Sequence, residues 1–125
     1  MKTFIKLIII VSLLVSFNSC KKNQTGGKAT IKGIVKHHNK PIANAFVYIK
    51  FNATEFPGSD YKLYDTYVEA DGNGNYTIPL YKGSYYIYGV GRDLDIPSPY
   101  EVVGGLSFSI RNKENLVKDI AVTED

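Results

Sequence analysis

Apolar and polar residues alternate along most of the chain after position 28, and a period of two residues is typical of strands that bury one face. The pattern predicts seven extended segments, which cover residues 29–37, 42–51, 61–70, 76–80, 85–90, 102–110 and 116–122. Turn-forming residues separate them, and no stretch after residue 20 has a helical period. The sequence therefore predicts an all-β fold, a seven-stranded antiparallel β-sandwich.

Each segment has one face that we expect to be buried. The expected core positions are Ile31, Gly33, Val35, Ala45, Val47, Ile49, Phe51, Thr66, Val68, Ala70, Tyr76, Ile78, Leu80, Tyr85, Ile87 and Gly89. A polar run with two glycines, residues 71–75, separates the third and fourth segments and predicts a β-hairpin there. Residues 38–41, 52–60, 81–84 and 93–99 are expected to be turns and loops.

The first twenty residues predict export from the cytoplasm. Two lysines precede an apolar run, residues 7–15, which is too short to span a bilayer and is typical of a secretory signal. The run ends at Cys20, where the sequence resembles the lipobox of bacterial lipoproteins. We expect a signal peptide over residues 1–19, a lipidated Cys20 with a flexible tether over 20–28, and one domain over 29–125. A plain secretory peptide with Cys20 as a free thiol is the alternative.

Charge and cysteine content narrow the function classes. The formal net charge is +3, but two of the 15 basic residues lie in the signal segment, which leaves 13 against 12 acidic ones. The mature chain is thus near neutral and has no basic stripe for nucleic acid. Cys20 is the only cysteine, so a disulfide framework and a thiolate zinc site are excluded. Lys21 after the cysteine, in place of an aspartate, favours the outer membrane, on its periplasmic side or at the cell surface.

Four sequence blocks together resemble a known family. Residues 33–35, 41–47, 71–78 and 83–87 read GIV, PIANAFV, DGNGNYTI and GSYYI. They are similar to the carboxypeptidase regulatory-like domain, a prealbumin-like (transthyretin-like) Greek-key β-sandwich, over residues 29–122. Such domains are mostly accessories that pack against, space or present another protein. The resemblance implies a non-catalytic structural or protein-interaction module of the cell envelope, with individual function in the longer segments 52–60 and 92–105.

Two constellations point weakly to metals or catalysis. Asp71, Asn73 and Asn75 imitate the start of a calcium loop, but the position for the bidentate carboxylate is Lys82. His37 and His38 are strand neighbours expected to point to opposite faces, no third histidine exists, and an exposed strand end is the favoured interpretation. We therefore expect no metal, no cofactor and no enzyme activity. A hydrolase that uses either histidine is the less favoured alternative, because no partner nucleophile is evident.

The ten tyrosines are the remaining functional signal. Tyr86 and Tyr88 alternate on the expected outer face, and Tyr64 and Tyr100 lie near loops. Exposed aromatic rings stack on sugars or anchor protein interfaces, so these four residues are the candidate ligand-binding positions. This predicts an envelope protein partner or, as the alternative, a carbohydrate-binding lipoprotein. The structural interpretation is that tyrosine is simply a good strand former at half exposure.

Overall fold

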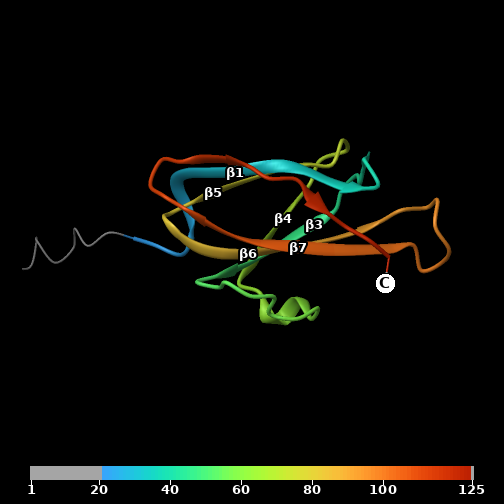
Figure 1. Ribbon diagram of the computed structural model, residues 1–125, viewed down its shortest axis with the longest axis horizontal. Helices are drawn as coiled ribbons and strands as arrows, with labels where there is room; N and C mark the ends of the chain where they lie inside the picture. Colours follow the sequence, from blue (N-terminus) through green and yellow to red (C-terminus); the bar gives the residue numbers. More distant parts are fainter. Residues whose placement is uncertain (1–20, 125) are drawn as a thin grey trace, which may run out of the picture.

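The computed structural model describes residues 21–124, which form two sheets connected by loops (Figure 1). The strands are β1 (Thr25–His37), β2 (Lys40–Pro41), β3 (Phe46–Phe51), β4 (Thr66–Glu69), β5 (Asn75–Leu80), β6 (Gly83–Arg92), β7 (Glu101–Ile110), β8 (Asn115–Val117) and β9 (Ile120–Ala121). One 3₁₀ turn, η1 (Tyr61–Leu63), is the only helical segment among these residues. The prediction of an all-β fold is confirmed, whereas the start of the expected third strand is η1. The expected signal peptide and Cys20 lie outside the described residues.

The two sheets are built differently. In the first, β1 pairs antiparallel with β5 and β2 and parallel with β8 and β9. The second is antiparallel throughout, in the order β4-β3-β6-β7. Figure 1 shows β1 and β5 lying over β6 and β7, which gives a sandwich-like arrangement of two layers. The expected segment 102–110 lies in one continuous strand, β7.

The core lies between the sheets and consists of the residues that the alternation selects. Twelve of the sixteen expected core positions are buried, including Val47, Ile78 and Ile87, which are fully inaccessible, and the other four are partly buried. Phe51 and Val68 are partly buried and pack against this core. Complete burial of such an aliphatic side chain contributes roughly 1.5–3 kcal/mol, so this alternation is the main source of stability.

The run 71–75 forms a turn, but the predicted hairpin is wrong. The Asp71 carboxylate accepts the backbone N–H groups of Asn73 and Asn75, each at 2.9 Å, and Gly74 has a φ of +76°. However, β4 pairs only with β3, and β5 pairs only with β1, so the turn links the two sheets. The backbone carbonyl of Gly74 is instead bonded by the N–H of Val35 in β1, at 2.9 Å.

The predicted last strand is divided into β8 and β9 at residues 118–119, where side-chain hydrogen bonds are added to the backbone bond from the Lys118 N–H to the Lys32 carbonyl. The Asp119 carboxylate accepts the N–H of Ile34 at 2.9 Å, and the buried Tyr76 hydroxyl donates to the Lys118 carbonyl at 2.5 Å. Gly33 lies directly beneath this corner, where a Cβ atom would collide with the Lys118 backbone. The glycine thus permits a close approach of backbone that a side chain would prevent.

Candidate functional site

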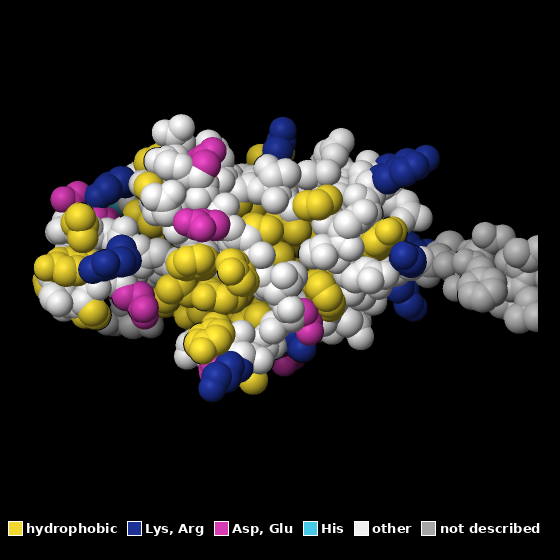
Figure 2. Space-filling view, turned by 180° about the vertical axis from the view of Figure 1, so that it is seen from behind, with side chains coloured by type: hydrophobic (Ala, Val, Ile, Leu, Met, Phe, Trp, Pro, Cys, Tyr) yellow, Lys and Arg dark blue, Asp and Glu magenta, His cyan; other side chains and the backbone are white. Residues whose placement is uncertain are grey.

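Eight aromatic rings form one connected cluster on the outer surface of the second sheet. We call this cluster the aromatic face; its members are Phe46, Tyr48, Phe56, Tyr61, Tyr64, Tyr67, Tyr86 and Tyr88. It follows from the same alternation as the core, because residues 47 and 49 of β3 point inward and residues 46 and 48 therefore point outward. Figure 2 shows hydrophobic side chains gathered in a continuous patch on this side of the molecule.

Part of the aromatic face is hollowed into a groove with a volume of about 470 Å³. Its lining comprises Phe46, Tyr48, Tyr61, Tyr64 and Tyr67, together with Lys62, Asp65 and Thr66. Tyr48 is central, since its ring centroid lies 5.8 Å from that of Tyr67 and 6.3 Å from that of Tyr61. Tyr61 and Tyr67 are 61% and 56% exposed. A groove of this size, with several rings and a few polar groups, fits a small or chain-like ligand.

The wall formed by residues 52–65 is held to the sheet by Tyr64. Its ring stacks on Tyr88 with centroids 5.7 Å apart and planes 10° apart, and its hydroxyl donates to the Gly58 carbonyl at 2.9 Å. The Asp65 carboxylate accepts the N–H of Phe51 at 2.7 Å, which fixes the other end of the wall to β3. Burial raises the pKa of Tyr64, so its hydroxyl stays protonated. The groove is therefore preformed.

The four tyrosines predicted as ligand-binding positions differ in exposure and location. Tyr88 is only 6% exposed, because Phe56 and Tyr64 cover it, so the expectation that its ring is exposed is wrong. Tyr86 is half-buried against Phe56, and Tyr64 lines the groove. Tyr100 lies apart, between β6 and β7, with Arg92 5.6 Å from its ring centroid.

The groove residues that the prediction left out lie on neighbouring strands. They are Phe46, Tyr48, Tyr61 and Tyr67. Phe46 and Tyr48 were already on the outward face of the second predicted strand, and β4 pairs with this strand so that Tyr48 is opposite Tyr67. The sequence already showed outward-facing aromatic residues on two predicted strands. It did not show that these two strands pair side by side and so bring the aromatic residues together.

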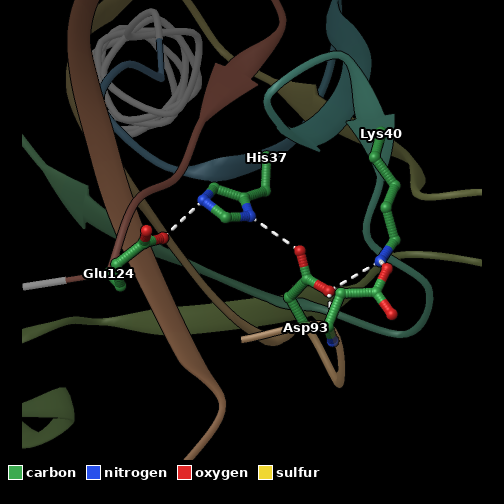
Figure 3. Close-up of polar contacts among 5 residues, drawn as sticks. His37, Lys40, Asp93 and Glu124 are labelled. Carbon is green, nitrogen blue, oxygen red and sulfur yellow. Dashed lines mark hydrogen bonds and ion pairs between the residues drawn. The ribbon is translucent and has the colours of Figure 1, made fainter. Parts of the chain in front are cut away.

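A second cluster lies at one end of the molecule, where β1, the β6–β7 loop and the C-terminal segment meet (Figure 3). His37 Nδ1 lies 2.7 Å from Asp93 Oδ2, and His37 Nε2 lies 2.5 Å from Glu124 Oε2. Lys40 Nζ donates to the other oxygen of Asp93 at 2.6 Å and to Asp95 at 2.5 Å. His37 and Asp93 are the two buried polar residues among those described. The expectation of an exposed strand end is therefore wrong for His37.

Charge pairing sets the protonation of this cluster. The Lys40 ammonium, and next the His37 imidazole, hold the pKa of the Asp93 carboxyl well below its usual range. The hydrogen bond to Asp93 raises the pKa of His37, and the Asp93 and Asp95 carboxylates raise that of Lys40. A buried carboxylate is stable only when it is paired in this way. No hydroxyl or thiol within residues 21–124 bonds either histidine.

Comparison of the sequence with protein-family models and with curated proteins finds no match. Within the part of the chain that the structure describes, no helix is long and apolar enough to cross a membrane.

Proposed function

We propose that this protein is a non-catalytic, lipid-anchored interaction module of a bacterial cell envelope, and that the aromatic groove is its binding site. In this proposal Cys20 carries the lipid anchor, and the two layers form a prealbumin-like Greek-key sandwich of the carboxypeptidase regulatory-like kind. The outer membrane is the proposed location. The aromatic groove carries the proposal, because solvent-exposed tyrosines on a preformed support are a binding device that stability does not require.

The lining of the groove favours a glycan as its ligand. A sugar ring has apolar C–H faces, which pack on aromatic rings, and a rim of hydroxyl groups, which need polar partners. The groove supplies both, with Tyr61 and Tyr67 exposed beside the charged groups of Lys62 and Asp65. A chain of tilted rings also suits successive sugar units. We therefore place envelope polysaccharide in this groove.

A protein partner is the second candidate, and the extent of the aromatic face favours it. Phe46 and Phe56 are 40% and 52% exposed, and they lie toward opposite ends of the cluster. An exposed apolar surface that reaches beyond one groove is typical of protein interfaces, in which tyrosine is enriched. This candidate corresponds to the protein-interaction module expected from the sequence, and it requires no polar or catalytic group beyond the aromatic face.

A binding screen separates the two candidates. Residues 21–125 contain every described strand and the whole core, so this soluble segment is the sample. It is screened against an array of envelope polysaccharides, and hits are followed by calorimetric titration. We expect binding to one glycan class, weakened at least about fivefold in Tyr61→Ala and Tyr67→Ala, because a stacking contact on an aromatic ring is worth about 1–3 kcal/mol for a nucleic-acid base and each 1.4 kcal/mol is tenfold in affinity.

Tyr100→Asn is the matched control. It removes an aromatic ring from another surface, and asparagine tolerates the positive φ of +65° at this position. Unchanged glycan binding in the two groove variants would overturn the assignment of the groove. No glycan binding by the folded segment, with capture of an envelope protein that needs Phe46 and Phe56, would establish the second candidate.

A further inference from the structure

We propose that His37, His38 and Glu124 form a binding site for one divalent transition-metal ion, with zinc as the best fit. Each residue offers one donor atom, and the three atoms lie within 4.8 Å of one another. Two imidazoles and one carboxylate form a recurrent zinc ligand set, which leaves a fourth position for water. This site is separate from the aromatic groove and does not depend on the function proposed for it.

The turn after β1 brings the two imidazoles together. His37 pairs with Lys40, so His38 and Asn39 form a two-residue hairpin loop, and their φ angles are +48° and +67°. Strand alternation ends at such a loop, and the two imidazole centroids are 4.2 Å apart. A left-handed backbone is uncommon for a residue other than glycine, although histidine is enriched there. The expectation that the histidines point to opposite faces fails for this reason.

His37 is oriented as a metal ligand. Its Nδ1 lies 2.7 Å from the buried Asp93 carboxylate, and its Nε2 lies 2.5 Å from Glu124 Oε2. In the neutral tautomer that carries its proton on Nδ1, the lone pair of Nε2 is available to a metal ion. A carboxylate behind a ligating histidine is the usual support that fixes the tautomer in metal sites. Nε2 is itself buried and has no partner with hydrogen-bond geometry among the described residues, although Glu124 Oε2 is only 2.5 Å away. Both atoms would ligate zinc once the half-exposed Glu124 carboxylate moves outward, because tetrahedral ligands at about 2.0–2.2 Å from the ion lie about 3.3 Å from one another.

The charged groups around the three proposed ligands also favour a bound cation. Three carboxylates, those of Asp93, Asp95 and Glu124, face the single ammonium of Lys40. The cluster is therefore net negative whichever protonation state His37 takes, and this favours a bound cation. His38 and Glu124 are exposed, so an ion can reach these two ligands from solvent. Imidazole ligands favour zinc, copper, nickel and cobalt over calcium and magnesium.

The test is metal titration of residues 21–125, prepared without a histidine tag. This segment has no cysteine, so thiolate binding does not interfere. We expect one equivalent of Zn²⁺ to bind in calorimetry, and Co²⁺ to bind with the visible absorption of a low-symmetry, four- or five-coordinate ion. Ca²⁺ should give no heat. His38→Asn and Glu124→Gln should each weaken Zn²⁺ binding at least about tenfold.

Asparagine keeps the left-handed backbone of residue 38, and both changes are at exposed side chains, so the variants should fold. Circular dichroism checks this directly. Glu69→Gln, at an exposed carboxylate on β4, is the matched control and should bind Zn²⁺ as the unchanged protein does. Absence of Zn²⁺ binding, or binding that His38→Asn and Glu124→Gln leave unaltered, would overturn the proposal.

Discussion

Tyr64 should determine whether the aromatic groove exists, because it attaches the wall of residues 52–65 to the second sheet. Two substitutions separate its contributions. Tyr64→Phe removes only the hydroxyl that donates to the Gly58 carbonyl at 2.9 Å. Tyr64→Ala also removes the ring, which stacks on Tyr88 and lies 5.9 Å from the Tyr48 ring.

The magnitudes follow from these contacts. A single hydrogen bond of this kind contributes about 1 kcal/mol to the free energy of unfolding. The two ring pairs add about 0.5–1.5 kcal/mol each, so Tyr64→Ala should lower stability by about 2–4 kcal/mol. With a urea dependence of about 2 kcal/mol per molar, the unfolding midpoint should fall by about 0.5 M in Tyr64→Phe and 1–2 M in Tyr64→Ala.

Urea unfolding followed by far-ultraviolet circular dichroism measures these shifts without relying on the altered tyrosine. Tyr64→Phe should retain glycan affinity, because the ring still forms the wall. Tyr64→Ala should lose it, since the wall is then held only at its Asp65 end and Tyr88 becomes accessible. The reasoning is refuted if Tyr64→Ala unfolds within 0.3 M urea of the unchanged protein, a shift of about 0.6 kcal/mol at that urea dependence, or if it binds glycan with undiminished affinity.

Three further predictions concern the scaffold. Tyr76→Phe should destabilise the protein by about 1–3 kcal/mol in urea, because the Lys118 carbonyl at the β8–β9 corner loses its buried donor; an unchanged midpoint would contradict this. Gly33→Ala should lower stability by at least about 2 kcal/mol, since its Cβ meets the Lys118 backbone, and a stabilised variant would show that this close approach is wrong. Backbone hydrogen bonds from Asn75 and Asn73 lower the pKa of Asp71 below its ordinary 3.8, so its stabilising effect is complete above that pH and is lost as pH falls through the folded pKa. Asp71→Asn should therefore melt at a lower temperature at pH 7 and approach the unchanged protein as pH falls through the folded pKa of Asp71, whereas a constant gap would refute the assignment.

Local patterns predicted the buried half of this molecule well. Val47 and Ile49 in β3, or Ile78 and Leu80 in β5, are buried because alternation acts within one strand and needs no knowledge of its partners. The turn at Asp71 was predicted for the same reason. The strand partners on either side of this turn were not predicted. Whether the turn closes a hairpin or links the two sheets depends on hydrogen bonds from β1.

The site was predicted less completely, because it depends on contacts between distant segments. Tyr88 points outward as expected, yet residues 52–65 fold over it, and alternation cannot report a covering loop. His37 is buried because Asp93, 56 positions later, supplies its partner. In both cases the residue types were visible, while the contacts that decide their role span large distances along the chain.

The central claim is that envelope glycan binds in the aromatic groove, and the most direct test is a nuclear magnetic resonance titration of residues 21–125. Oligosaccharides released from envelope polysaccharide are added to isotope-labelled protein. The account predicts shift changes concentrated in the backbone amides of residues 46–48 and 61–67 and in the ring signals of Tyr61 and Tyr67. Shifts confined to the loop around Tyr100, or no shifts at any soluble concentration, would contradict it.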